Sequence, residues 1–251
     1  MLTIIISTYS HRILRLKKVV KFKHEKIKYL IIHQTHHKVD VPYFLIREDI
    51  TIIQDDSIGL TKSRNIGLKN CETNFALIAD DDVEYIFEGI QNVLDIIEND
   101  RPDFATFKIK SPDKEYKNYT QDKTIIDNNL KHFISSIEIL LNINKIKQNN
   151  IQFDERFGLG TKLIGGEENI LIHDCINHGL KGIYYPIYIV IHPYESSGKK
   201  NYSETDRYFK LGASCKRKNV KRSFFSFRNR NIFKMIINYL NYLRGRNYIK
   251  N

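Results

Sequence analysis

The sequence contains only three cysteines and no apolar run long enough to cross a membrane. Cys71, Cys175 and Cys215 are scattered and form no CxxC pair, which argues against a disulfide framework and a zinc site. A membrane span needs about 18 or more apolar residues, and the first residues lack a basic leader with a cleavage site. We therefore expect a cytoplasmic protein. No internal repeat or low-complexity linker divides the chain.

Basic residues are concentrated near the C-terminus of this 251-residue chain, whose net charge is +11. Residues 199–251 hold 15 lysines and arginines against two acidic residues, whereas residues 1–198 hold 25 against 27. The chain therefore divides into a nearly neutral body, 1–198, and a basic extension, 199–251. This division argues against a nucleic-acid-binding protein, which the pI of about 9.4 would otherwise suggest.

Short apolar runs alternate with helical patterns through the body. Strands are predicted at 2–7, 29–33, 50–53, 75–79, 103–109 and 182–191, and helices at 59–70, 87–99, 133–147 and from 168 onward. Apolar residues also recur at helix-like spacings in 12–26, and 111–131 is expected to be an irregular or antiparallel excursion. This alternation predicts an α/β domain with a mostly parallel central sheet, which binds ligands at the carboxyl ends of its strands.

Three consecutive carboxylates, Asp80 to Asp82, follow directly on the apolar run 75–79. They would repel one another unless a cation or solvent offsets their charge, and oxygen ligands suit Mg²⁺ or Mn²⁺. A solvated acidic turn is the simpler alternative, because charge runs usually face water. A position at the end of a predicted strand, shared with Ser7-Thr8-Tyr9, favours a binding site instead.

Four segments resemble those of the family-2 glycosyltransferases of the GT-A fold, which use a nucleotide-sugar donor and invert the anomeric centre. Two are the opening IIISTYS and GLTKSRNIGL at 59–68, which is similar to the family's G-x-x-x-A-R-N segment. The others are DDD at 80–82, similar to its DxD motif, and FDERFG followed by GEE at 166–168, similar to a segment that ends in a Glu-Asp pair. The resemblance covers roughly residues 1–195 and implies a single, Rossmann-like GT-A domain.

The resemblance implies how a divalent cation, Mn²⁺ or Mg²⁺, would be held at the leaving diphosphate. Asp82 is assigned to the metal, and Asp80 to the metal or to the ribose of the donor. Asp81 is counted with the donor site, although a structural role suits it better. His192 follows the last apolar run, as in relatives where a histidine helps hold the metal or diphosphate. A histidine satisfied at a strand end is an equal alternative.

The remaining donor-binding residues that the resemblance implies are Thr8, Tyr9, Gln34 and Arg64. Many relatives end the second strand with an acidic residue that contacts the donor, but here the stretch is His33-Gln34-Thr35. Gln34 could pair with a base edge, so a uridine donor is not implied. Arg64 would lie near the nucleotide, or it would only brace its loop.

Inversion requires a general base that removes the proton of the acceptor hydroxyl, which contributes about 10²–10⁴-fold to the rate. The family places this base at the second acid of its pair, which is Glu168 here, with Glu167 as the second choice. A helix is predicted to start at this point, and its positive end would favour one of these glutamates by about 0.3–1 kcal/mol. One glutamate is therefore expected to stabilise the start of the helix, and the other to act as the catalytic base.

The basic extension includes an amphipathic helix predicted over 232–243. Its apolar stripe consists of Phe233, Ile236, Ile237, Leu240 and Leu243. An apolar stripe flanked by cations suits an anionic membrane surface, where each basic residue contributes about 1 kcal/mol. We expect the extension to dock on the inner face of the cell membrane, and packing on the catalytic domain is the alternative.

The function expected from this resemblance is an inverting, hexosyltransferase-type enzyme. It would move a sugar from a nucleotide-diphosphate sugar to a hydroxyl of a saccharide or lipid-linked saccharide. The expected setting is synthesis of a bacterial capsule, O-antigen or lipooligosaccharide, with no nucleic acid as partner. Because Glu168 stands where the family has aspartate, a relative that binds sugar nucleotide without turnover is the alternative.

Overall fold

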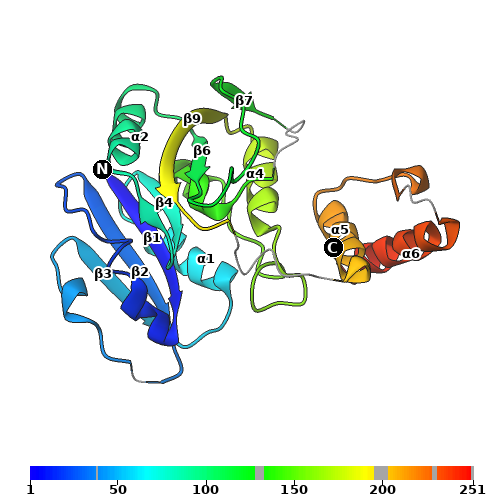
Figure 1. The fold of residues 1–251 in the computed structure, drawn as a ribbon, viewed down its shortest axis with the longest axis horizontal. Helices are drawn as coiled ribbons and strands as arrows, with labels where there is room; N and C mark the ends of the chain where they lie inside the picture. Colours follow the sequence, from blue (N-terminus) through cyan, green and yellow to red (C-terminus); the bar gives the residue numbers. More distant parts are fainter. Residues whose placement is uncertain (38, 128–132, 195–202, 228–230, 250–251) are drawn as a thin grey trace.

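The computed structural model describes residues 1–37, 39–127, 133–194, 203–227 and 231–249. These residues hold one nine-stranded sheet with the order β3-β2-β1-β4-β8-β6-β9-β5, and β7 pairs with β9 (Figure 1). The strands are β1 (Leu2–Tyr9), β2 (Ile27–Gln34), β3 (Ile50–Asp55), β4 (Phe75–Asp80), β5 (Glu84–Tyr85), β6 (Phe104–Lys110), β7 (Thr124–Ile126), β8 (Ile139–Asn142) and β9 (Gly182–Ile191). The helices are α1 (Leu60–Asn70), α2 (Phe87–Asn99), α3 (Ile143–Gln148), α4 (Glu167–Asn177), α5 (Glu204–Arg217) and α6 (Ile232–Tyr248).

Most strands of the sheet run in one direction. β3, β2, β1 and β4 pair in parallel, and so do β6 and β9. β8 lies antiparallel between β4 and β6, and β5 and β7 lie antiparallel to β9. The predicted α/β class with a mostly parallel sheet is therefore confirmed.

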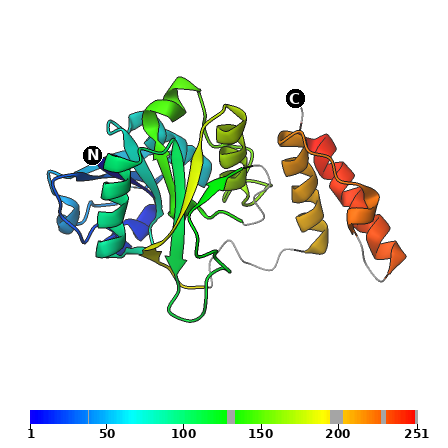
Figure 2. The same cartoon turned by 90° about the horizontal axis from the view of Figure 1, so that it is seen from above.

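Helices cover both faces of the sheet, as Figure 2 shows for α2 and α4. Ile4 and Ile6 of β1 pack with α2 in one apolar cluster, and Ile5 packs with α1, α3 and α4 in the other. Both faces of β1 are buried because successive side chains of a strand alternate between faces. α1 approaches β1 so closely at Gly67 that an added Cβ would overlap Ile5. The carboxyl ends of β1, β2 and β4 are thereby fixed side by side.

The helix predicted over 133–147 is wrong for most of its length. Residues 133–147 form a 3₁₀ helix, Ser136–Glu138, followed by β8 and the short helix α3. Residues 12–26 lie partly in a 3₁₀ helix, Ser10–Arg15, and then in turns before β2. Short buried apolar runs fit either a strand or a helix by pattern alone, and partners far along the chain decided for the strand β8.

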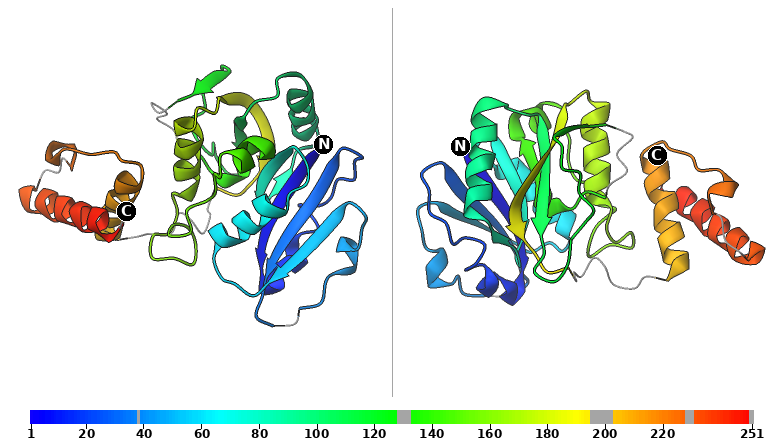
Figure 3. Two further views of the ribbon diagram at one scale, coloured as in Figure 1. Left: turned by 180° about the vertical axis from the view of Figure 1, so that it is seen from behind. Right: turned by 45° about the horizontal axis from the view of Figure 1, so that its top comes forward.

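The basic extension forms a helical hairpin of α5 and α6 beside the body of the molecule (Figure 3). The two helices cross at Gly212 and Gly245, where an added Cβ would overlap the backbone of the facing helix. The boundary expected at residue 198, like Arg228 and Arg230 of the extension, lies outside the described residues. In the described part of the chain, no helix combines the length and the apolar character that a membrane span needs.

Candidate active site

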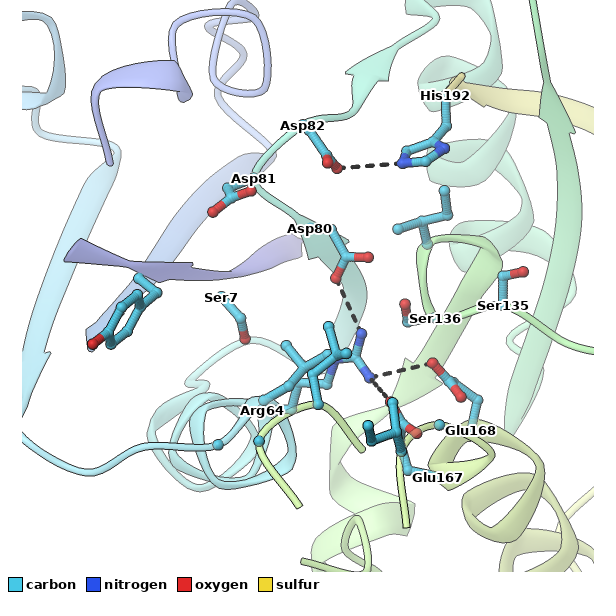
Figure 4. A pocket seen from close by; sticks show the side chains of 18 of the residues that line it. Ser7, Arg64, Asp80, Asp81, Asp82, Ser135, Ser136, Glu167, Glu168 and His192 are labelled. Carbon is cyan, nitrogen blue, oxygen red and sulfur yellow. Dashed lines mark hydrogen bonds and ion pairs between the residues drawn. The ribbon is translucent and has the colours of Figure 1, made fainter. Parts of the chain in front are cut away.

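All ten residues predicted for the site line one cavity of about 750 Å³ at the carboxyl ends of the parallel strands. β1 and β4 supply the acidic side of this cavity, and the start of α4 supplies the side that faces it (Figure 4). The glycine-bearing loop 158–166 and the segments 116–117 and 133–137 complete the lining. The four sequence motifs therefore meet in space, although up to about 160 residues separate them in sequence.

Asp81 is held by protein groups and turned away from its two neighbours. Its carboxylate accepts hydrogen bonds from Thr8 Oγ1 at 2.9 Å and from Arg12 Nε at 2.9 and 3.0 Å, and its side chain is buried. Burial raises the pKa of Asp81, although the bonds from Arg12 and Thr8 act against that shift. Sequence reasoning missed Arg12, because nothing local pairs it with an acid 69 residues away. Asp81 lines the cavity, but its carboxylate is engaged by Arg12 and Thr8 and fixes the acidic loop.

Asp82 and His192 face each other across the mouth of the cavity (Figure 4). His192 Nε2 lies 3.3 Å from Asp82 Oδ1, and His192 Nδ1 lies 2.6 Å from the carbonyl oxygen of Pro193. That carbonyl can only accept, so Nδ1 donates to it, and Nε2 donates to the Asp82 carboxylate when the imidazole is protonated. The hydrogen bond with His192 lowers the pKa of Asp82, while burial opposes it. For His192, burial opposes protonation, but the bond to Asp82 raises its pKa overall.

This pair fits part of the coordination shell of a divalent cation. A carboxylate oxygen and an imidazole nitrogen converge on one point, and Mn²⁺ accepts both kinds of ligand. Among the described residues, no three His, Cys, Asp or Glu side chains gather into a complete metal site. Enzymes that act on nucleotides often hold their ion with one or two carboxylates plus the phosphates of the substrate. The two side chains therefore suffice only together with a bound diphosphate.

Arg64 is fully buried and joins the strand side of the cavity to the helix side. Its Nη2 donates to Asp80 Oδ1 at 3.0 Å, and its Nη1 lies 3.0 Å from Glu167 Oε1 and 3.4 Å from Glu168 Oε1. α1 brings it there because Ser63, one residue before, donates to Ser7 of β1 at 2.8 Å. A single guanidinium thus orders acids from two separate motifs.

Glu167 and Glu168 open α4, whose N-cap is Gly166 in a left-handed conformation. Glu167 lies under the loop against Gly158, whereas the Glu168 carboxylate points toward Ser136 and the cavity (Figure 4). Burial, followed by the charge of Glu167, raises the pKa of Glu168 to about 8, against the opposing charge of Arg64. A carboxylate with a pKa near neutral can accept a proton from a hydroxyl and release it again.

The donor-binding residues expected on the strand side also lie at this cavity. Gln34 ends β2, is buried, and donates from its amide to Ser57 Oγ at 3.0 Å. With the amide nitrogen engaged, its oxygen remains as the acceptor for a ligand. Tyr9, at the end of β1, is 46% exposed and lines the entrance. Thr8 lines the cavity as well, but its hydroxyl is used by Asp81.

One wall of the cavity was not foreseen from the sequence. Lys117 donates to Glu138 at 2.6 Å, and Tyr119 donates to the same carboxylate at 3.0 Å. Glu138 is fully buried in a segment that was expected to be helical, and burial raises its pKa. Of these three residues Lys117 lines the cavity, and because it is 21 residues from Glu138, no local signal in the sequence could have revealed the pair.

Comparison with known proteins agrees with this architecture. The family model described as glycosyl transferase family 2 matches residues 42–168. No curated protein sequence matches the chain. The crystal structure of S. aureus TarS 1-349 is similar, with a TM-score of 0.64 at 15% identity, over 96% of this chain and 71% of that one. The same protein in complex with UDP-GlcNAc has a TM-score of 0.66 at 15% identity, over 98% and 73%.

At such low identity these structures show a shared fold, the GT-A fold of TarS. The crystal structure described as S. aureus TarS, with a TM-score of 0.62 at 16% identity, is covered over only 39% of its length, by 85% of this chain. The matched family segment spans half of the present chain and includes GLTKSRNIGL, the three aspartates and both glutamates. The chain therefore belongs to glycosyl transferase family 2.

Proposed function

We propose that this protein is an inverting glycosyltransferase that transfers a sugar from a nucleotide-diphosphate sugar to a hydroxyl group. The observation that carries the proposal is the pairing of two unlike acidic sites in one cavity. One site, at Asp82 and His192, keeps its negative charge beside an imidazole. The other, at Glu168, is poised to take up a proton. A displacement with a charged leaving group and a hydroxyl nucleophile needs both.

Each side of the cavity has its part in this reaction. Asp82, His192 and Asp80 would hold a Mn²⁺ or Mg²⁺ ion, which supplies charge neutralisation at the diphosphate when bound. Glu168 accepts the proton of the acceptor hydroxyl while that oxygen bonds to the anomeric carbon. The bond from this carbon to the diphosphate breaks, and its electron pair leaves with the nucleoside diphosphate. Attack from the face opposite the leaving group inverts the anomeric centre.

Donor recognition is proposed for the strand side of the cavity. Gln34 offers an amide oxygen at the end of β2, and Tyr9 offers an aromatic surface at the end of β1. The UDP-GlcNAc bound to the TarS structure supports a nucleotide sugar as the donor class. Because Gln34 stands where many relatives have an acid, we propose only that the donor is a nucleotide sugar. The identity of its nucleobase is left to experiment.

The setting that we propose is assembly of a bacterial surface polysaccharide on a lipid-linked or soluble saccharide acceptor. α6 supports this setting, because most of its apolar stripe is exposed. Ile232, Phe233, Ile236, Ile237 and Leu240 are each at least 41% exposed, whereas Leu243 of the predicted stripe packs inside the hairpin. Lys221, Arg222 and Lys234 are exposed nearby. An apolar face with neighbouring cations suits an anionic lipid surface.

The assignment of the base is tested with the variants Glu168→Gln and Glu167→Gln. Transfer from a panel of nucleotide sugars is measured for both, together with donor binding by calorimetry. Glu168→Gln should reduce transfer by about 10²–10⁴-fold and spare donor binding. Glu167→Gln is the matched control, since it changes the neighbouring carboxylate in the same way. Unchanged transfer in Glu168→Gln would refute the assignment, and donor binding without transfer in the wild type would favour a non-catalytic relative.

Membrane docking is tested by flotation with phosphatidylglycerol vesicles and with phosphatidylcholine vesicles. Phe233→Glu with Ile237→Glu should abolish flotation with the anionic vesicles, because both side chains are exposed and neither holds the fold. Ser223→Glu with Asn247→Glu makes the same change in charge at exposed polar positions and should reduce flotation only slightly. Equal flotation of the two double variants, or no flotation of the wild type, would contradict docking through the apolar stripe.

A further inference from the structure

One residue of the cavity wall comes from the basic extension rather than from the catalytic body. Lys210, on α5, lines the cavity together with Ile164, Gly165 and Gly166. Its Nζ donates to the carbonyl oxygen of Ile164 at 3.0 Å. Ile164 is 46 residues earlier in the chain, so this contact joins the extension to the glycine-bearing loop of the body.

The position of Ile164 gives this contact its importance. Gly165 and Gly166 follow it with φ angles of +77° and +93°, which side chains other than glycine rarely adopt. Glu167 and Glu168 come directly after this turn and begin α4. A group that holds the carbonyl of Ile164 therefore holds the turn from which both glutamates project.

α5 is fastened to the same region at a second point. Arg217 donates to Asp154 at 2.7 Å and to both carboxylate oxygens of Asp174, on α4, at 3.1 and 2.6 Å. Between these contacts Ala213 packs into a small apolar cluster with Leu163 of the loop, with Phe157 just before it and with Ile170 of α4. The loop that leads to the glutamates is therefore held between α4 and α5.

The charges around Lys210 agree with this arrangement. Burial lowers the pKa of Lys210, while the charges of Glu167 and Glu168 act against that shift. The ammonium group and the two carboxylates therefore interact across the turn, in addition to the hydrogen bond with Ile164.

We propose that Lys210 is a positioning residue for the general base, and that α5 is consequently part of the catalytic unit. This inference rests on the proposed function. Through its bond to Ile164, Lys210 fixes the turn that aims Glu168 at the acceptor hydroxyl. Small displacements of a catalytic group can cost up to about 10²-fold in rate, so loss of this contact should lower turnover rather than binding.

The test compares Lys210→Met, Lys210→Arg and Arg207→Met in the full-length protein. Arg207 is an exposed cation one turn earlier on α5 that does not line the cavity. Its charge acts on Lys210, so Arg207→Met makes the same change in net charge while leaving the contact with Ile164 in place. Lys210→Met should lower kcat by about 10- to 100-fold and leave the donor KM and the affinity for nucleoside diphosphate within about twofold. Lys210→Arg, which can still donate to Ile164, should recover most of the rate, and Arg207→Met should match the wild type.

A second readout does not depend on activity. Amide hydrogen exchange over residues 164–168 should be faster in Lys210→Met than in Arg207→Met, and unchanged elsewhere in α4. A kcat of Lys210→Met within twofold of the wild type would overturn the proposal, and so would unchanged exchange over the turn. A wild-type protein that transfers no sugar would instead refute the proposed function, with the exchange experiment still reporting on the contact itself.

Discussion

The strand side and the helix side of the cavity treat their acidic residues differently. On the strand side Asp81 pairs with Arg12, and Asp82 pairs with His192 and, at 3.4 Å, with Arg12. On the helix side Glu167 and Glu168 share the single guanidinium of Arg64, which also serves Asp80. The hydrogen bond with His192 lowers the pKa of Asp82, whereas burial and then the charge of Glu167 raise the pKa of Glu168 to about 8. Similar side chains are thus prepared for opposite tasks, one to stay ionised and one to exchange a proton.

Arg64→Met removes the cation that the two sides of the cavity share and should have the largest effect on stability. Asp80, Glu167 and Glu168 would lose their shared cation, and the two glutamates are buried. Removing one partner of a buried ion pair costs about 3–5 kcal/mol, which urea unfolding would measure. Adding Glu167→Gln should recover part of the loss, because one uncompensated charge is removed. A loss below about 1 kcal/mol would show that these acids do not depend on Arg64.

The pH dependence of transfer tests whether Glu168 exchanges a proton during the reaction. Glu168 acts as a base only when ionised, so the rate should rise about tenfold per pH unit up to about pH 8 and then level off. The charged groups that act on Glu168 are Glu167, Arg64 and Asp80, and the charge of Glu168 acts in turn on Lys117 and Lys210. A rate that does not change between pH 6 and pH 8 would contradict the role of Glu168.

The same pKa predicts the direction of the stability change. Because folding raises the pKa of Glu168 above its usual value of 4.5, the folded state binds more protons than the unfolded state between pH 4.5 and about 8. The contribution of Glu168 to stability is therefore lost as the pH rises through this window. Glu168→Gln should flatten this part of the stability curve, as urea unfolding at several pH values would show.

Comparing Asp81→Asn with Asp82→Asn distinguishes a structural aspartate from a functional one. These two variants should change stability least among those proposed. Asp81→Asn weakens its bonds with Arg12 and Thr8 and should cost about 1–3 kcal/mol in unfolding free energy. Asp82 has a side chain that is 42% exposed, so Asp82→Asn should leave the unfolding free energy nearly unchanged. Equal losses in the two variants would contradict the distinction.

The strand side could be predicted from the sequence because its signals are local. β1, β2 and β4 are mostly apolar and are buried on both faces, and β4 ends at Asp80, with Asp81 and Asp82 directly after it. Residues 87–99, where apolar side chains recur every three or four positions, form α2 as predicted. The site residues expected from the family motifs also reach one cavity.

The helix side and its surroundings could be predicted only in part. β8 is a short buried strand whose pattern also fits a helix, and only its pairing with β4 and β6 distinguishes the two. The partners Arg12 of Asp81 and Lys117 of Glu138 come from distant segments. Lys210 lies in the segment 199–251, which its basic charge identified as an extension separate from the body. Only the packing of α5 on the loop reveals that Lys210 is part of the cavity wall.

The central claim, that one side of the cavity binds the metal and diphosphate while the other supplies the base, is tested by one calorimetric series. Nucleoside diphosphates and nucleotide sugars are titrated, with and without Mn²⁺, into the wild type, Asp82→Ala and Glu168→Gln. We predict that Mn²⁺-dependent binding of one nucleotide is present in the wild type, lost in Asp82→Ala and retained in Glu168→Gln. Binding that survives in Asp82→Ala, or no binding of any nucleotide to the wild type, would contradict the account.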